Sequence, residues 1–356
     1  PAIDGLVVVS DAADVAVALG EQPEPEILRH VGVLILVHQH VFEAPLIVLQ
    51  HAQVVGTVAV GVVNAGSNRA RETDALEVAA LAPVEIISAD SRMVYRWMDV
   101  GTAKPDAAAL VRAPHHLIDV VDPDEPFPVV EWVARARDAI RRIAARGRQP
   151  LIVGGTGLYL RALCDGLEIP PVPPNEALRA ELEALASSEG WEALHRTLQE
   201  VDPDGAARID GRNVRRVVRA IEVTHVTGKP FSAWQTRSAP PFATRWLGLD
   251  LPVAELDTVI ERRVREQFDA GLVAEVQRLR DRGFGRSLPP LTGLAYREAA
   301  QLLDGVVGAS EAIARYAAST RQYARRQRSW FRPDTRIRWL DARIANAADA
   351  LAHFRQ

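Results

Sequence analysis

The sequence predicts an α/β protein in which parallel strands form the core and a separate helical segment is inserted. Two short apolar runs, Val84–Ile87 and Gln149–Val153, end in a polar turn and a glycine turn, which is typical of buried parallel strands. Between residues 169 and 244, a proline-rich linker is followed by helix-forming sequence alone. With 356 residues, 48% of them hydrophobic, the chain is long enough to bury a substantial core.

Asp90 follows the first predicted strand within the sequence Ser-Ala-Asp-Ser. Ligands of open α/β sheets bind outside the carboxyl ends of the strands, and an acid placed there can act as a general base. An aspartate after a strand is also a common N-cap of the next helix, and an isolated motif of this kind favours the cap. Whether Asp90 is a general base or a helix N-cap therefore has to be judged from the residues around it.

The second predicted strand runs directly into Gly154-Gly155-Thr156-Gly157, and a helix is expected from Leu158. A strand, a glycine turn and a helix allow main-chain amides to approach an anion closely. Glycine turns also serve tight packing, so this motif alone does not establish an anion site.

Two arginine-rich segments are candidates for contact with a polyanion. The formal net charge of −4 gives no global sign of nucleic-acid binding, so any such contact has to come from local basic patches. Residues 205–226 are dense in arginine, although a solvated charged face is the ordinary explanation of such a run. On a helix over residues 315–332, one stripe carries Arg321, Arg325, Arg328 and Arg332 with no acids between them, which suits a phosphate backbone.

The stretch from Ser88 to Pro105 closely resembles the signature of the tRNA dimethylallyltransferases, the enzymes that prenylate the adenosine beside the anticodon. The resemblance continues through Pro114–Asp119, Gly154–Tyr159, Arg219–Val223 and Thr320–Gln327, and covers roughly residues 73–342. It implies a P-loop-NTPase-like core over residues 73–168 and 245–342, a helical tRNA-binding insert over 169–244, and a C-terminal tail over 343–356.

The resemblance also implies an activity and a set of site residues. The expected reaction transfers a dimethylallyl group from dimethylallyl diphosphate to N6 of the adenosine on the 3′ side of the anticodon, with Mg²⁺ as cofactor. Asp90, Thr156 and Arg263 would be catalytic, while Gly154, Gly155, Thr156 and Thr73 would bind the diphosphate. An ordinary surface pair with a neighbouring glutamate is the alternative for Arg263. The implied tRNA-binding residues are Asp90, Ser91, Arg92, Arg179, Arg215, Arg216, Arg219, Arg321, Arg325 and Arg328. No metal ligand can be named.

Residues 1–72 show no resemblance to the family, whose members carry a phosphate-binding loop of the form Gly-x-x-x-x-Gly-Lys-Ser/Thr. Counting back from Asp90 leads to the segment Gly66–Thr73, where Arg71 replaces the second glycine and Glu72 replaces the lysine. A glutamate facing a diphosphate would repel it. Two hypotheses follow: this copy is an impaired enzyme, or residues 1–72 are not the natural ones and reflect a frameshifted or misassigned start.

Three other functions compete with the main interpretation. An adenylate isopentenyltransferase would share Asp90 and the glycine turn but would not need the helical insert. A non-catalytic tRNA-binding relic would keep the insert and lose the phosphate loop. A P-loop nucleotide kinase is disfavoured because the lysine is missing. We further expect a monomeric cytoplasmic protein with no membrane role, since the single cysteine, Cys164, excludes an internal disulfide and the apolar runs are too short to span a bilayer.

Overall fold

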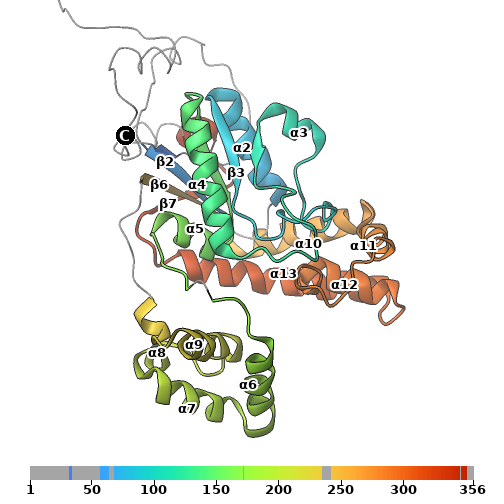
Figure 1. Cartoon of the computed structure of the whole chain (residues 1–356). Helices are drawn as coiled ribbons and strands as arrows, with labels where there is room; N and C mark the ends of the chain where they lie inside the picture. Colours follow the sequence, from blue (N-terminus) through green and yellow to red (C-terminus); the bar gives the residue numbers. More distant parts are fainter. Residues whose placement is uncertain are drawn as a thin grey trace, which may run out of the picture. The chain divides into compact units, whose positions relative to one another are not determined.

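The computed structural model describes residues 32–33, 57–63, 68–170, 172–234, 242–344 and 346–350, with side chains described from Ala75 onward. The chain divides into two compact units, one over residues 1–160 and 241–356 and the other over residues 161–240. Figure 1 shows the helices and strands of each unit. The predicted α/β class with a parallel sheet is confirmed.

The larger unit is built on a parallel sheet with the strand order β4-β3-β5-β2-β6-β7, and β1 pairs in addition with β2. The strands are β1 (Gly32–Val33), β2 (Thr57–Val63), β3 (Val84–Ser88), β4 (His115–His116), β5 (Gln149–Gly154), β6 (Ala243–Asp250) and β7 (Ile337–Asp341). Both predicted strands exist, and every residue of β3 is buried. Because β3 and β5 are parallel neighbours, with Ser88 opposite Val153, Asp90 and the glycine turn emerge side by side.

The middle of the sheet includes a strand to which the sequence assigned no role. β2 pairs with β5 on one side and β6 on the other, and α2 (Asn68–Leu81) begins shortly after it. The backbone thus follows a strand-to-helix path at the place where a phosphate loop is expected. Gly66 and Ser67 lie outside the described residues, as do the side chains of Arg71, Glu72 and Thr73, so the loop's chemistry stays a prediction from sequence.

The remaining helices of the larger unit flank the sheet or form a second apolar cluster. They are α3 (Ala107–Arg112), α4 (Val129–Ala145), α5 (Gly157–Cys164), α10 (Val253–Asp269), α11 (Leu272–Asp281), α12 (Leu294–Leu303) and α13 (Ala309–Phe331), where α5 runs into the second unit. Helices α10 to α13 gather together in Figure 1 and share an apolar core that includes Ile260, Leu279 and Tyr316. Met98 joins this core, so it fastens the loop after β3 to the helices.

The sequence of Leu117–Val121 also predicts a strand, and this prediction is wrong. β4 covers only His115–His116, and Val121 makes a single isolated bridge with Tyr95. Leu117 and Asp119 have φ angles of 63° and 54°, in the left-handed region that interrupts a strand. This stretch therefore folds back against the loop after β3 and does not extend the sheet.

The second unit is helical, with α6 (Glu176–Glu189), α7 (Trp191–Val201), α8 (Pro203–Arg208), α9 (Val214–Thr227) and a 3₁₀ helix over Phe231–Trp234. Asn175 is the N-cap of α6, because its side chain accepts a hydrogen bond from the Leu178 amide at 3.1 Å. The buried core contains Leu182, Leu194 and Val217, with Leu178 packed against it.

Candidate functional site

Asp90 and Thr156 meet at the carboxyl ends of β3 and β5. The amide of Thr156 donates to the Ala89 carbonyl at 3.1 Å, and the amide of Ser91 donates to Thr156 Oγ1 at 3.0 Å. Asp90 lies between these two contacts, so its position relative to Thr156 is fixed through the main chain. The sequence predicted both residues, and the fold brings them together.

Asp90 closes a turn with one carboxylate oxygen and leaves the other available. Its Oδ1 accepts a hydrogen bond from the Arg92 amide at 2.8 Å, which fixes the local turn. Among the described residues, no donor is recorded for Oδ2, and the side chain is only half-buried. The alternative of a helix N-cap is wrong, because residues 91–97 form turns and no helix begins directly after Asp90.

The glycines of the turn are required by close packing. A Cβ at Gly154 would lie 2.4 Å from the Ala89 carbonyl carbon, which is a backbone atom that cannot move aside. A Cβ at Gly155 would lie 2.1 Å from Gln327 Nε2, which donates to the Gly155 carbonyl at 2.8 Å. A Cβ at Gly157 would lie 2.2 Å from Trp330 Nε1. The turn is thus held between β3 and α13, in a position that keeps Thr156 at the sheet edge.

Arg263 supplies a cation near this edge. Burial lowers the pKa of Arg263, while the neighbouring Tyr316, Asp90 and Glu266 act in the opposite direction. Its Nε is buried and, within the described part of the chain, has no hydrogen-bond partner. Buried guanidinium groups are normally paired, so an unpaired donor facing Asp90 is the arrangement that an incoming anion would complete.

Aromatic side chains enclose the same region. Tyr159 is buried, and its burial together with nearby Tyr95 and Asp90 raises the pKa of its hydroxyl well above the ordinary value. Trp132 stacks on Tyr159 with ring centroids 4.5 Å apart, and Trp132 Nε1 donates to the Ser88 carbonyl. Tyr159 therefore lies near Asp90, with Trp132 packed on its ring.

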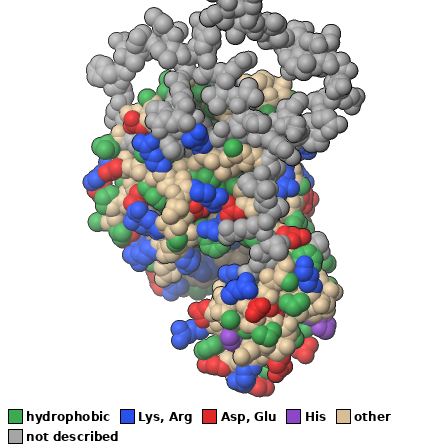
Figure 2. Space-filling model, turned by 90° about the vertical axis from the view of Figure 1, so that its left-hand side faces the viewer, with side chains coloured by type: hydrophobic (Ala, Val, Ile, Leu, Met, Phe, Trp, Pro, Cys, Tyr) green, Lys and Arg blue, Asp and Glu red, His purple; other side chains and the backbone are tan. Residues whose placement is uncertain are grey.

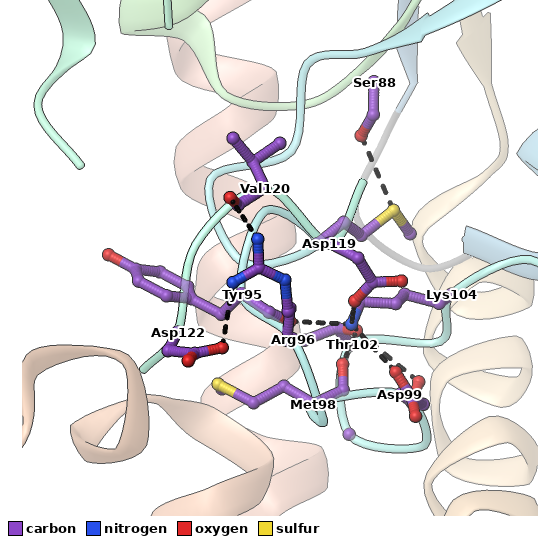
Figure 3. A network of polar contacts seen from close by, with 12 residues as sticks. Ser88, Tyr95, Arg96, Met98, Asp99, Thr102, Lys104, Asp119, Val120 and Asp122 are labelled. Carbon is purple, nitrogen blue, oxygen red and sulfur yellow. Dashed lines mark hydrogen bonds and ion pairs between the residues drawn. The ribbon is translucent and has the colours of Figure 1, made fainter. Parts of the chain in front are cut away.

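The loop after β3, residues 89–104, is held by polar anchors that the sequence analysis missed. Figure 3 shows Lys104 pointing between Asp99 and Asp119, with Nζ 2.8 Å and 2.6 Å from their Oδ1 atoms. The buried carboxylate of Glu275 accepts hydrogen bonds from the amides of Asp99, Val100 and Gly101. These residues position the loop, and only their partners in the folded chain reveal that role.

Ser91 and Arg92, both expected to contact tRNA, lie beside Asp90. The Ser91 amide is used in the contact to Thr156, and Arg92 Nη1 donates to the Pro289 carbonyl at 2.8 Å. Arg92 therefore already joins the loop to the segment before α12. Both remain at the edge of the site.

The arginine stripe on α13 is matched by acids from other elements. Arg321 pairs with Glu261 at 2.9 Å and Arg325 with Asp257 at 3.7 Å, both acids of α10. Arg328 pairs with Asp250 at the end of β6, at 3.0 Å. Arg332 also pairs with Asp250. The prediction of an uncompensated cationic face is therefore wrong, although Arg325 stays exposed. Basic and acidic side chains are also interspersed on the face of the molecule that Figure 2 shows.

The predicted arginines of the helical unit fall into two groups. Arg179 and Arg219 both bind the fully buried carboxylate of Glu222, at 2.8 Å from Arg179 Nε and 2.5 Å from Arg219 Nη1. Arg215 and Arg216 are exposed, and no ion pair is recorded for them among the described residues. Only the second group is free to bind a polyanion.

Neither a resident metal cluster nor a membrane span is found in the part of the chain that the structure describes. No group of three or more histidine, cysteine, aspartate or glutamate side chains there could hold a metal ion. Among the same residues, no helix is both long and apolar enough to cross a bilayer.

Comparison with known proteins identifies the family. Residues 93–334 match the model of the IPP transferase family. A tRNA dimethylallyltransferase of Thermomicrobium roseum is 47% identical over 267 residues, which span 75% of this chain and 81% of that protein. A relative of the same name in Geobacillus thermodenitrificans is 45% identical over 259 residues, or 72% and 82% of the two chains.

Solved structures agree with the sequence relatives. The tRNA isopentenylpyrophosphate transferase of Bacillus halodurans is 37% identical, with a TM-score of 0.56 over 80% of this chain and 89% of that chain. A eukaryotic dimethylallyltransferase acting on tRNA, 24% identical, has a TM-score of 0.64 over 80% of this chain and 73% of that chain and supports the fold, which is P-loop-like in these proteins. The chain belongs to the IPP transferase family.

Proposed function

We propose that this protein transfers a dimethylallyl group from dimethylallyl diphosphate to N6 of the adenosine on the 3′ side of the anticodon in tRNA. The observation that carries the proposal is the junction of Asp90, Thr156 and Arg263 at the carboxyl ends of β3 and β5, in a chain that belongs to this family. It is a prenyltransferase, and the comparisons do not favour a relic, an adenylate isopentenyltransferase or a nucleotide kinase.

Asp90 is the general base of the proposed reaction. Adenine N6 is a poor nucleophile because its lone pair is delocalised into the ring, so a proton has to leave as the new bond forms. The N6–carbon bond forms, the carbon–oxygen bond to the diphosphate breaks, the proton moves to Asp90 Oδ2, and the diphosphate keeps the electron pair. The half-buried carboxylate with its free oxygen suits this step.

Arg263 and the turn around Thr156 stabilise the departing diphosphate. The buried, unpaired Nε of Arg263 is a donor aimed at the place where negative charge grows. The glycine turn packs closely against Ala89 and Gln327 and so fixes Thr156 at this edge of the sheet, where the diphosphate would lie. Gly154, Gly155 and Thr156 are therefore proposed to bind the diphosphate, together with Thr73, whose side chain lies outside the described residues.

Mg²⁺ is the proposed cofactor, bound with the substrate. Mg²⁺ keeps several waters and is commonly held by one or two protein oxygens together with phosphate oxygens. Thr156 Oγ1 lies at this edge and fits the role of such a protein oxygen, and the ion would neutralise charge on the diphosphate. The target base comes from an anticodon loop, where it can be splayed out into a pocket. We propose a monomer acting in the cytosol, where tRNA is modified.

A pair of substitutions at Asp90 tests the proposal and separates its two roles. Asp90→Asn keeps an oxygen that can accept from the Arg92 amide but cannot take a proton, whereas Asp90→Ala loses both functions. In a chain whose residues 66–73 carry the family's phosphate loop, both variants should lower the single-turnover rate of prenyl transfer by about 10² to 10⁴, while tRNA affinity stays nearly intact. In Asp90→Asn, a rate above half of that of the chain with Asp90 intact would show that Asp90 only closes the turn to Arg92.

A further inference from the structure

Trp97 is exposed and held in an unfavourable backbone conformation. Its side chain is 44% exposed, although a large aromatic residue gains most when buried. Its φ angle is +67°, in the left-handed region that residues with a Cβ adopt only at a cost. An exposed ring on a strained backbone adds little to folding, so it points to a role in binding.

The ring of Trp97 already carries a cation on one side. The guanidinium carbon of Arg282, just past α11, lies 4.0 Å from the Trp97 ring centroid. Arg278 is exposed one helical turn earlier on α11, and no ion pair is recorded for it among the described residues. The nearby acid, Asp281, accepts a hydrogen bond from Gln277 at 2.7 Å. This surface therefore keeps cations available, unlike the stripe on α13.

The surface is rigidly connected to the site. Trp97 belongs to the same loop as Asp90, residues 89–104. The next residue, Met98, is fully buried, and the Asp99 amide is held by Glu275 of α11, the helix that carries Arg278. The loop and α11 therefore form one frame that presents the ring in a fixed orientation.

We propose that Trp97, backed by Arg282, is a stacking platform for an unpaired base of the RNA substrate, and that Arg278 contacts a phosphate beside that base. The proposal rests on the proposed function, which brings a single-stranded loop to Asp90. Unpaired RNA bases stack on aromatic rings, and adjacent arginines hold the backbone. Trp97 thus positions the RNA and takes no part in proton transfer.

Equilibrium binding of a synthetic anticodon stem–loop RNA tests the platform. Trp97→Gly should weaken binding about 5- to 150-fold, the range expected for loss of one stacked base. Trp97→Phe, which keeps a ring, should bind within a few-fold of wild type. Glycine tolerates the left-handed backbone, so Trp97→Gly should not lower the Tm. Hydrogen exchange of the amides over residues 89–104 should stay as in wild type.

Salt dependence tests the arginines. Arg278→Ala should flatten the log–log salt slope by about 0.7, the value for one single-strand phosphate contact. Arg141→Ala is the matched control, because this exposed arginine of α4 pairs with Asp138 and should leave affinity and slope unchanged.

The outcomes distinguish a failure of the Trp97 platform from a failure of the proposed function. Unchanged RNA affinity in Trp97→Gly overturns the platform, as does a loss of affinity accompanied by faster exchange over residues 89–104, which would mark a structural role. If the wild-type chain binds no RNA, the proposed function fails and the platform with it. If the wild-type chain binds RNA and transfers the prenyl group, and the Trp97 variants behave like wild type, the platform alone is rejected.

Discussion

Arg179 in the helical unit provides a sharp test of whether its arginines stabilise the fold or bind tRNA. Arg179 Nε and Nη2 donate to the two carboxylate oxygens of Glu222, which is completely buried. Arg219 and the Asn175 amide complete the set of donors around this carboxylate. We expect Arg179→Gln to destabilise the helical unit, because it removes one partner of a buried ion pair.

The pKa of Glu222 indicates how much stability the helical unit should lose in Arg179→Gln. Burial alone would raise the pKa of Glu222, but the hydrogen bonds from Arg179, the Asn175 amide and Arg219 hold it at about 2, against an ordinary value of 4.5. At about 1.4 kcal/mol per pKa unit, this shift corresponds to about 3 kcal/mol. The side chains of Arg179 and Arg219 are 30% and 29% exposed, and the Asn175 amide and Arg219 remain in Arg179→Gln, so solvent screening and these remaining donors reduce our figure for the loss of Arg179 to about 2 kcal/mol.

Hydrogen exchange of the full-length chain measures this effect. In Arg179→Gln, the amides of α6 and α9 should exchange about 30-fold faster, the factor equivalent to about 2 kcal/mol. Arg216→Gln is the matched control, since this exposed arginine of α9 has no recorded ion pair among the described residues. Wild-type exchange in Arg179→Gln, together with weaker tRNA binding, would refute the structural role.

The lowered pKa of Glu222 also predicts the direction in which the stability of the helical unit changes with pH. The pKa of Glu222 is lower in the folded chain than in the unfolded chain, so the stabilisation is complete above about pH 4.5 and is lost as the pH falls toward about 2. Exchange in α9 should therefore accelerate over this interval in the wild type. In Arg179→Gln, the acceleration should be smaller and should end at a higher pH, because the carboxylate has lost a donor and its folded-state pKa is less depressed.

Two further predictions concern polyanion binding. Neutralising Arg321 and Arg325 should weaken binding to any tRNA and flatten the log–log salt slope by roughly one to two units, whereas unchanged affinity and slope would mean that these arginines serve only their pairs with Glu261 and Asp257. Replacing the segment Gly66–Thr73 by Gly-Pro-Thr-Ala-Ser-Gly-Lys-Thr, with one added residue after it, should restore binding of dimethylallyl diphosphate with Mg²⁺; equal tight binding by the unaltered chain would refute the need for the loop.

The sheet edge that carries Asp90 and the glycine turn was predictable because its signals are local. An apolar run followed by Asp90, and another followed by a glycine turn, each define a strand end within a few residues. Parallel pairing then places both strand ends at one edge of the sheet. The strand expected over Leu117–Val121 failed because apolar composition does not report the left-handed backbone at Leu117 and Asp119. That conformation accompanies the long-range ion pair of Asp119 with Lys104.

The role of each arginine was not predictable, because it depends on which carboxylate reaches it in the folded chain. Arg179 meets Glu222 from a separate helix, and Arg321 meets Glu261 across the contact between α13 and α10. A helical stripe read from sequence contains no information about acids that arrive from other elements.

Charge compensation therefore indicates where a polyanion can bind. An arginine that already shares a buried carboxylate loses that interaction if it turns to a phosphate, so Arg179 is poorly suited to the task. An exposed pair such as that of Arg321 can exchange partners at little cost, since surface ion pairs contribute about 0 to 1 kcal/mol. Among the described residues, no ion pair is recorded for exposed Arg278 or for Arg263, whose Nε is buried, so these two arginines have no such interaction to lose. We therefore propose that the diphosphate binds at Arg263, near Asp90, and that the RNA backbone binds at the surface around Arg278.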